Sequence, residues 1–326
     1  MPPPLKSGNL RECVSCKQCF GPGQQLCPNC FIELVTIEAI PHLLNERYRL
    51  DRVVTRGASN LLFAGFDVVE EQPVAIKLIR ATAMVDPRAQ ERFLREAELA
   101  AGLKHPGLAE IFAFGLLKEG GAYVAFEQMP GKLLRSEMRR VGRFTVEQAV
   151  PLLCAIAGVL DDAHCAGLVH RDLKPENIIL LEVDAATGPP AVKLVDFSFG
   201  RVAGGRAYQP GKTARLQDIG QLPARPAYLS PEQFLGAEAD ARADIFSLGV
   251  IAYEMLAGQP PFKASRVGEM AGKVLHERPA PLRSFNPEIS IVIEAEVLRA
   301  LEKEPHNRQQ RAAEFKRELQ NALHWK

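Results

Sequence analysis

The feature that most constrains this chain is the eight-residue run H-R-D-L-K-P-E-N at residues 170–177, followed nineteen residues later by Asp196. Asp172 is a candidate base that can orient a hydroxyl group and accept its proton. Asn177 and Asp196 offer hard oxygen ligands of the kind that Mg²⁺ prefers. Lys174 lies two residues after Asp172, where its ammonium can reach a transferred phosphate. Together these residues suit phosphoryl transfer, in which the protein mainly aligns the reactants and neutralises charge.

The run resembles the catalytic loop of a protein kinase, and Asp196-Phe197 resembles the metal-binding motif that follows it in that family. An isolated H-R-D triplet is read more simply as a charged surface turn, but a longer match and a second motif favour the kinase interpretation. From about Tyr48 to the C-terminus the chain resembles the eukaryotic-type Ser/Thr protein kinases of bacteria. This resemblance implies an α+β, two-lobed fold, with an antiparallel sheet and one helix in the N-lobe and a mainly helical C-lobe.

The sequence V-A-I-K that ends at Lys77 has the pattern of a strand with a charged residue at its end. By resemblance to the family, Lys77 contacts the α- and β-phosphates of ATP, and Ala75 belongs to the same nucleotide-binding strand. The apolar spacing predicts a helix over residues 86–103 that carries the ion-pair partner of this lysine. Glu96 is the preferred partner because the R-E-A sequence there matches the family's register, and Glu98 is the alternative.

The segment from residue 121 to residue 131 is expected to form the hinge strand and linker. In that register Phe126 is the gatekeeper, and backbone groups of Glu127 and Met129 face adenine. This assignment follows from the resemblance alone.

The glycine-rich loop of the family aligns on residues 54–64, which makes Val54 and Gly57 candidate nucleotide contacts. The expected G-x-G-x-x-G is replaced by T-R-G-A-S-N, so that only Gly57 remains. Glycine takes positive φ without steric cost, Asn60 tolerates it moderately and Thr55 resists it. The loop is therefore expected to be stiffer or looser over ATP than is usual for the family.

Two other positions depart from the family pattern. Ser198 replaces the glycine of D-F-G, which narrows the backbone conformations of the turn without removing the ligand Asp196. Arg225 stands where the family has a threonine that braces the catalytic residues, and an arginine cannot accept a hydrogen bond. We expect Arg225 to pair either with an acidic substrate residue or with Asp172 itself.

Regulation is suggested by Arg171, which directly precedes Asp172. In kinases with this pair the arginine binds a phosphate on the activation loop and orders that loop. Between Phe199 and Leu229 the only serine or threonine is Thr213, which makes it the candidate phosphosite. The alternative is a solvated loop threonine without a regulatory role.

Three residues are expected to support the C-lobe. Asp244, in the stretch D-I-F-S-L-G, resembles the buried aspartate that holds the catalytic-loop backbone in the family. Glu232, in S-P-E, is expected to pair with Arg308 inside the lobe.

A separate signal lies near the N-terminus, where five of the seven cysteines fall within eighteen residues: Cys13, Cys16, Cys19, Cys27 and Cys30. Overlapping C-x-x-C pairs around a turn have the spacing of a zinc ribbon, in which two knuckles give four thiolates to one Zn²⁺. The pair Cys27 and Cys30 is the clearer knuckle, and the other is either Cys13 with Cys16 or Cys16 with Cys19. The ten-residue gap between Cys16 and Cys27 slightly favours the first choice.

The alternative for these cysteines is a disulfide cluster, which is less expected in a sequence without signs of export. So short a segment cannot bury a sizeable core unaided, so metal binding would supply its folding free energy. Cys154 and Cys165 lie in or beside an apolar helix predicted over residues 146–166, and we expect both to be small buried side chains.

The length of 326 residues fits a two-lobed domain with a small appendage, and 47% hydrophobic residues is ordinary for a globular protein. A formal net charge of +1 gives no electrostatic case for binding nucleic acid or a membrane surface. The arginines at positions 135, 139, 140 and 143 are read as a solvated helix face. Residues 1–4 lack the features of a signal peptide and no long apolar run follows, so we expect a cytoplasmic protein without a membrane partner.

The expected organisation is a disordered N-terminus at 1–12, a zinc-ribbon-like module at 13–31 and a linker at 32–47. A protein kinase domain follows at 48–326, with the N-lobe over about 48–126 and the C-lobe over about 132–326.

The expected function is an ATP- and Mg²⁺-dependent protein kinase that modifies serine and threonine hydroxyls of protein substrates. Lys174 in the catalytic loop favours Ser/Thr over Tyr specificity by resemblance. One alternative is a pseudokinase scaffold with weak or no transfer, because Thr55, Asn60 and Arg225 depart from the family pattern. A second is a regulator that binds an unknown partner through its zinc module.

Overall fold

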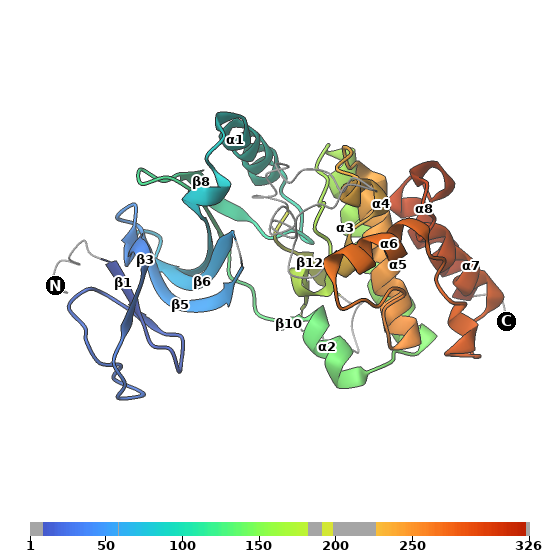
Figure 1. The fold of residues 1–326 in the computed structure, drawn as a ribbon, viewed down its shortest axis with the longest axis horizontal. Coiled ribbons are helices and arrows are strands. Elements are labelled where there is room, and N and C mark those ends of the chain that lie inside the picture. Colours follow the sequence, from blue (N-terminus) through green and yellow to red (C-terminus); the bar gives the residue numbers. More distant parts are fainter. Residues whose placement is uncertain (1–8, 58, 182–190, 198–225, 324–326) are drawn as a thin grey trace. The chain divides into compact units, whose positions relative to one another are not determined.

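The computed structural model describes residues 9–57, 59–181, 191–197 and 226–323. It divides into two compact units, one of residues 1–101 and 110–128 and the other of residues 102–109 and 129–326. The first is built from antiparallel sheets with one long helix, and the second is mainly helical (Figure 1). The α+β, two-lobed fold expected from the sequence is therefore confirmed. Ser198, Thr213 and Arg225 lie outside the described residues.

The first unit is organised around a six-stranded antiparallel sheet with the order β4-β5-β6-β7-β9-β8. Its strands are β4 (Leu43–Leu44), β5 (Tyr48–Arg56), β6 (Asn60–Asp67), β7 (Gln72–Ile79), β8 (Ile111–Leu116) and β9 (Ala122–Glu127). Alternate residues of β6 are buried, as expected of a strand with one face on a core. Helix α1 (Pro87–Gly102) fits the predicted helix and buries Ala89, Phe93, Ala97 and Ala100.

A second, three-stranded sheet precedes this one, with the order β2-β1-β3. Its strands are β1 (Asn9–Glu12), β2 (Cys19–Phe20) and β3 (Val35–Pro41), and we call residues 9–41 the cysteine module. Strand β1 lies in the range expected to be disordered, and β3 lies in the expected linker. Both form because Leu10 and Ile37 are buried in one core with Leu50 and Phe63 of the six-stranded sheet.

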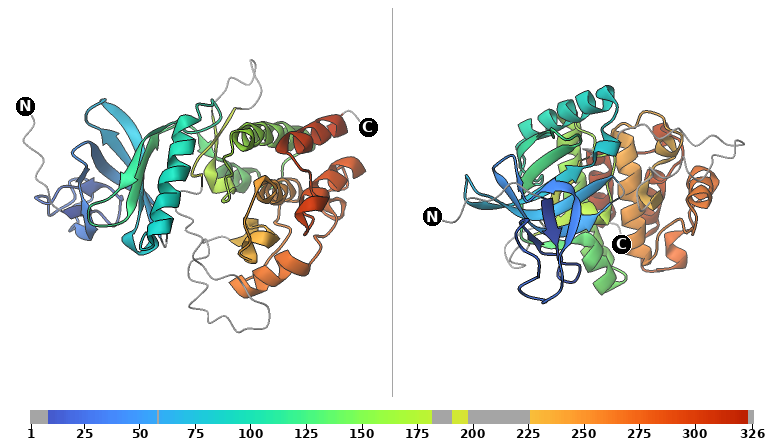
Figure 2. Two further views of the ribbon diagram at one scale, coloured as in Figure 1. Left: turned by 90° about the horizontal axis from the view of Figure 1, so that it is seen from above. Right: turned by 60° about the vertical axis from the view of Figure 1, so that its left-hand side comes forward.

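The second unit contains seven α-helices in its described part. They are α2 (Leu134–Val141), α3 (Val146–Cys165), α4 (Pro231–Phe234), α5 (Ala241–Ala257), α6 (Val267–His276), α7 (Ile291–Ala300) and α8 (Ala312–Leu323). Helix α5 is buried along most of its length and packs against α3, α7 and α8 (Figures 1 and 2). A small sheet of β10 (Lys132–Leu133), β11 (Ile178–Leu180) and β12 (Val192–Leu194) carries the catalytic-loop region.

Local signals fix the ends of the main helices. Thr145 and Gln148 form a capping box at the start of α3, which matches the predicted helix. Asp240 caps the start of α5, and Gly258 ends that helix with φ of 72°. Within the described ranges, none of the helices combines the length and the apolar character that a transmembrane span needs.

Candidate active site

One buried carboxylate holds the backbone of the predicted catalytic loop. Asp244, in the first turn of α5, is fully buried, and its two oxygens accept hydrogen bonds of 2.7 Å from the backbone N–H groups of His170 and Arg171. The Nε2 atom of His164 lies 2.8 Å from the same carboxylate. Asp244 thus occupies the structural position expected of it, and the loop is fastened to the most buried helix of the unit.

His170 connects the catalytic loop to the segment that follows β12. Its Nε2 atom donates to the carbonyl oxygen of Val195 at 3.1 Å, and its ring lies 4.5 Å from that of Phe197 between centroids. Burial lowers the pKa of His170, so the ring is neutral at physiological pH. The N–H of Asp172 lies 3.4 Å from Nδ1 of the same ring. A neutral imidazole can serve as donor at Nε2 and acceptor at Nδ1, which matches both contacts.

Asp172, Lys174 and Asn177 form a compact polar cluster. The Nζ atom of Lys174 lies 2.6 Å from an Asp172 carboxylate oxygen, and the Asn177 amide nitrogen donates to the Asp172 carbonyl at 2.9 Å. The amide nitrogen of Asn177 is occupied by this hydrogen bond. Its amide oxygen is therefore the atom that can bind Mg²⁺. The cluster joins a candidate base, a cation for a phosphate and a candidate metal ligand.

The two candidate magnesium ligands sit at the ends of neighbouring strands. Asn177 directly precedes β11, Asp196 follows β12 by two residues, and the N–H of Val195 donates to the Asn177 carbonyl at 3.0 Å. Asp196 has φ of 66° and Arg171 has φ of 60°, a region that non-glycine residues rarely adopt. Such backbone strain persists where surrounding contacts hold it, which is common at functional sites.

Arg135 corrects one expectation from the sequence, because it is buried instead of lying on a solvated helix face. Its guanidinium, on α2, donates to Glu176 and to Glu254 at 2.8 Å each and also contacts the hydroxyl of Tyr228. Burial and the Glu254 carboxylate raise the pKa of Tyr228 well above its usual range, so the phenol stays protonated and donates to Glu254.

This cluster joins the residue before Asn177 to α5 and to the segment before α4. Sequence reasoning missed it because four arginines close together look like a charged surface. The signal that could have found it is the helical spacing of Arg135 with the buried Leu134 and Met138.

Two further contacts support the same region. The Arg308 guanidinium, fully buried, donates to both oxygens of Glu232 at 2.8 Å, which confirms the expected ion pair. Gln233, the residue after Glu232, donates to the carbonyl of Arg171 at 2.8 Å, a contact that the sequence does not predict. The start of α4 is thereby attached to the catalytic loop on one side and to the C-terminal part of the unit on the other.

In the first unit, the candidate nucleotide residues lie along β7 and the elements around it. Lys77 is buried in β7 between Leu62 of β6 and Val124 of β9. Ala75 lies two residues earlier on the same strand. On α1, Glu96 is half-buried whereas Glu98 is exposed, which favours Glu96 as the residue turned toward the protein.

The described residues of the predicted phosphate loop lie between β5 and β6. The N–H of Gly57 donates to the Asn60 carbonyl at 2.9 Å, and Arg80 donates to the Gly57 carbonyl at 2.7 Å. A Cβ atom at Gly57 would lie 2.8 Å from Oδ1 of Asn60, so a larger residue at position 57 would require the Asn60 side chain to move. Val54, on β5, is 49% exposed.

The predicted hinge residues fall at the boundary of the two units. Glu127 ends β9 and donates its N–H to the Glu110 carbonyl at 2.8 Å, and Phe126 precedes it opposite Ala75. Met129, half-buried, is the first residue after this strand to be counted with the second unit.

A second candidate site is formed by four cysteines of the cysteine module: Cys13, Cys16, Cys27 and Cys30. Their sulfur atoms all lie within 4.8 Å of one another, and those of Cys16 and Cys27 are 3.7 Å apart. Four sulfurs about 2.3 Å from one tetrahedral Zn²⁺ would be about 3.8 Å apart, which fits this spacing. All seven cysteines are free thiols, so the structure contains no disulfide cluster here.

The two halves of this cluster repeat the same backbone geometry. The N–H of Lys17 donates to the Cys13 carbonyl at 2.9 Å, and the N–H of Phe31 donates to the Cys27 carbonyl at 2.9 Å. Lys17 and Phe31 both have positive φ, at 64° and 57°. Two equivalent knuckles therefore present two sulfurs each to one point.

Cys19 lies outside the group of four, which selects between the alternatives left open by the sequence. It is buried in the core shared with the six-stranded sheet, and burial together with Glu12 raises the pKa of its thiol to about 12. Of the remaining cysteines, Cys154 is buried as expected, whereas Cys165 is exposed at the end of α3, so its expected burial is wrong.

Comparison with known families identifies the fold. The protein kinase domain family matches residues 48–319. The chain belongs to the protein kinase family. Among its relatives, the Ser/Thr protein kinase pkn3 of Myxococcus xanthus is 32% identical over 287 residues, covering 87% of this chain and 51% of that protein. The Ser/Thr protein kinase PknB of Mycobacterium tuberculosis is 33% identical over 282 residues, covering 86% of this chain and 43% of that protein.

Solved kinase structures show the same fold. The Mycobacterium tuberculosis PknI kinase domain superposes with a TM-score of 0.66 at 25% identity, covering 87% of this chain and all of that one. The chain spans about half, or less, of the length of the curated relatives that it matches. The similarity to these relatives thus concerns only part of each of them.

Proposed function

We propose that this chain is an ATP- and Mg²⁺-dependent protein kinase that transfers the γ-phosphate to serine and threonine hydroxyls of proteins. The observation that carries the proposal is the cluster of Asp172, Lys174 and Asn177 on a loop whose backbone is fastened to Asp244. A loop that is already positioned before substrate binds reduces the cost of aligning the reacting groups.

Each proposed residue has one role. Asp172 orients the acceptor hydroxyl and takes its proton, Lys174 stabilises the transferred phosphoryl group, and Asn177 with Asp196 holds Mg²⁺, which neutralises charge on the phosphates. The nucleotide contacts would be supplied by Lys77 with Glu96, by Val54, Gly57 and Ala75, and by backbone groups of Glu127 and Met129. Arg171 is proposed to bind an activation-loop phosphate, with Thr213 as the candidate phosphosite.

The test is transfer of labelled γ-phosphate from ATP to a generic basic protein substrate, followed by identification of the modified amino acids. We expect phosphoserine and phosphothreonine that depend on added Mg²⁺. Phosphotyrosine alone would contradict the proposed specificity, and binding of Mg²⁺ and ATP without any transfer would favour the scaffold alternative that the altered glycine-rich loop suggests.

We also propose that Cys13, Cys16, Cys27 and Cys30 bind one Zn²⁺ and that the cysteine module contacts a regulatory partner. The sulfur spacing and the two equivalent knuckles support the metal proposal. Metal analysis should find about one zinc per chain, lost in Cys27→Ser and kept in Cys165→Ser. We also propose a cytoplasmic location, because the cysteines are free and the proposed reaction needs ATP, which suits a reducing, ATP-containing compartment.

A further inference from the structure

The cysteine module is fastened directly to the strand that leads into the predicted phosphate loop. The N–H of Val53 on β5 donates to the carbonyl of Lys17 at 3.0 Å, and Gln18 forms an isolated antiparallel bridge with Arg52. Lys17 is the residue after Cys16 and closes the first knuckle. A backbone hydrogen bond to β5 therefore lies one residue from Cys16, a candidate metal ligand.

A second attachment starts next to another of the four cysteines. Glu12, which precedes Cys13, is an almost fully buried carboxylate with a side-chain exposure of 3%, and it forms an ion pair with Arg56. Arg56 is the last residue of β5 and directly precedes Gly57. Both residues that flank the first knuckle thus hold the half of β5 that adjoins the predicted phosphate loop.

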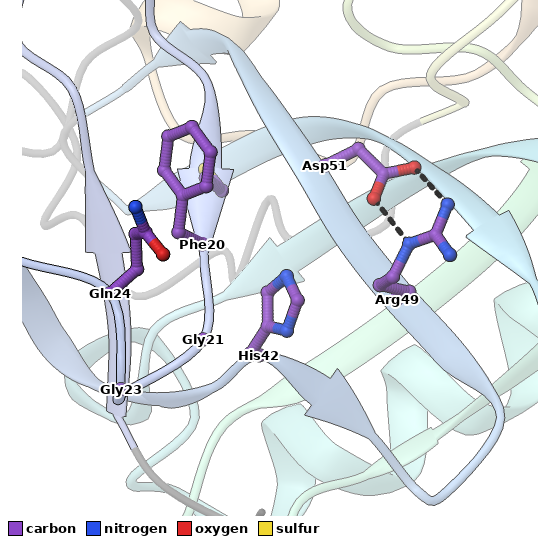
Figure 3. A pocket seen from close by; sticks show the side chains of 8 residues that line it. Phe20, Gly21, Gly23, Gln24, His42, Arg49 and Asp51 are labelled. Carbon is purple, nitrogen blue, oxygen red and sulfur yellow. Dashed lines mark hydrogen bonds and ion pairs between the residues drawn. The ribbon is translucent and has the colours of Figure 1, made fainter. Parts of the chain in front are cut away.

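The other half of β5 is held differently, as Figure 3 shows. There Phe20, Gln24 and His42 face Arg49 and Asp51 of β5 across an open pocket of about 460 Å³. Arg49 and Asp51 pair with each other, at 2.6 Å and 3.2 Å, and not with the module. The backbone and ion-pair contacts described above therefore lie on the stretch Arg52–Arg56, beside the loop, whereas Leu50 joins the module through the shared apolar core.

The first knuckle closes the paired strands β1 and β2, and the N–H of Cys13 donates to the Gln18 carbonyl at 2.9 Å, but the apolar core around the four sulfurs is small. The core around the four sulfurs consists of the buried Cys13, Cys27 and Leu34, with Phe20, Ile32 and the other two cysteines partly buried against it. So small an apolar cluster cannot hold two knuckles together without a metal ion. Loss of the metal would loosen Lys17, which lies in the loop between β1 and β2, whereas Leu10 and Cys19 would stay in the larger core and Glu12 would stay paired with Cys19 and Val35.

We propose that Zn²⁺ at Cys13, Cys16, Cys27 and Cys30 is a regulatory site that sets nucleotide affinity by fixing the end of β5. This inference rests on the kinase and zinc proposals above. With the metal bound, Lys17 and Glu12 hold Val53 and Arg56, and the turn at Gly57 keeps its place. Without the metal, the end of β5 opens more often, and ATP binding must include the free-energy cost of ordering it.

The experiment compares the full chain with Cys27→Ser, using zinc content, hydrogen exchange of peptides covering residues 48–57 and the dissociation constant of a fluorescent ATP analogue with Mg²⁺. We expect Cys27→Ser to lose zinc and to show faster amide hydrogen exchange over residues 52–57. Its dissociation constant for the ATP analogue should be at least about fivefold higher than that of the wild type. Cys165→Ser, an exposed cysteine in the other unit, should match the wild type. Peptides from α5 should exchange as in the wild type and so report that the rest of the chain is folded.

A second variant, Glu12→Gln, removes the charge that pairs with Arg56 and leaves all four cysteines in place. It should keep its zinc, yet exchange faster at residues 54–57 and bind the analogue more weakly. Zinc loss in Cys27→Ser without a change in exchange or affinity would overturn the inference. A wild type without zinc would contradict the metal site and with it this inference. A wild type that holds zinc but binds no ATP analogue would contradict the kinase proposal. In that case the exchange data still decide whether the metal fixes the end of β5.

Discussion

Asp244 shows how much of a catalytic loop can depend on one residue that does no chemistry. It lies more than seventy positions after His170 in the sequence, yet both of its oxygens bond to that loop's backbone. Substitution of a buried carboxylate that accepts hydrogen bonds from two N–H groups can leave those groups without acceptors. Its effect on catalysis would therefore pass through the position of Asp172.

We predict that Asp244→Asn lowers the free energy of unfolding by about 1–3 kcal/mol, since an amide N–H₂ then faces one of the two N–H donors. The turnover number should fall about 10–100-fold, because misplacement of a catalytic group is costly. Asp240→Asn, at the cap of the same helix, keeps an accepting side chain and serves as the matched control. Denaturant unfolding and steady-state kinetics give the two readouts. An Asp244→Asn protein equal to the control in both would contradict this role.

Most candidate site residues could be predicted from the sequence because they lie close together in it. Asp172, Lys174 and Asn177 occur within six positions, so a fixed local backbone brings them together. Arg135 could not be assigned this way, since its partners are 41 and 119 residues away and only the fold brings them near. The choice of Cys13 over Cys19 was likewise a matter of packing, because both satisfy the C-x-x-C spacing.

At the level of elements, the cluster around Arg135 joins four parts of the chain: α2, the catalytic loop, α5, and the segment that precedes α4. One guanidinium faces two carboxylates and a neutral phenol, so the cluster carries a formal charge of −1, and the Arg135 side chain keeps 11% exposure. The arrangement couples the geometry of four segments through one guanidinium, whose planar fork suits several acceptors at once.

We predict that Arg135→Met destabilises the protein near the low end of the 3–5 kcal/mol expected for breaking a buried pair. The low end applies because the Glu176 side chain keeps 25% exposure and the Glu254 side chain keeps 16%. The melting temperature should then fall by about 6–12 °C. Arg139→Met, on the exposed face of the same helix, should change it little. Equal melting temperatures for the two variants would show that the cluster is not important for stability.

The packing of α7 against α8 contains a pair of carboxylates that makes stability depend on pH. Burial, with the neighbouring Glu318, raises the pKa of Glu296 from an ordinary value of 4.5 to about 7. The Gln309 amide nitrogen bridges them, at 3.1 Å from Glu296 and 3.2 Å from Glu318. Between these two pKa values the folded state holds a proton that the unfolded state has released.

The sign of the effect follows by linkage. The stabilisation is fully present below about pH 4.5 and is lost as pH rises through about 7. We predict that Glu296→Gln removes this loss. The melting temperature of the variant, relative to that of the wild type at the same pH, should therefore rise between about pH 5 and pH 8. Glu304→Gln, an exposed neighbour, should follow the wild type. Parallel curves for all three proteins across this range would contradict the shift.

At the scale of the whole molecule, the cysteine module and the six-stranded sheet share one core, so the module is an extension of the N-lobe rather than a separate domain. The sequence did not predict this, because strands of two to seven residues carry little periodic signal and β1 pairs with β3 across more than twenty residues. The two-lobed fold was predictable because its motifs are local and characteristic of one family. What links the module to the kinase domain is tertiary packing, which only the structure reveals.

The most direct test of the proposed kinase activity is the rate of phosphate transfer by the wild type and by Asp196→Asn, measured with the same protein substrate at saturating Mg²⁺ and ATP. Asp162→Asn, an exposed aspartate of α3, is the control. We predict wild-type rates for the control and a loss of about 10²-fold or more for Asp196→Asn, because that variant lacks a charged metal ligand. Equal rates for Asp196→Asn and the wild type would contradict the proposed role of Asp196 as a metal ligand in phosphate transfer.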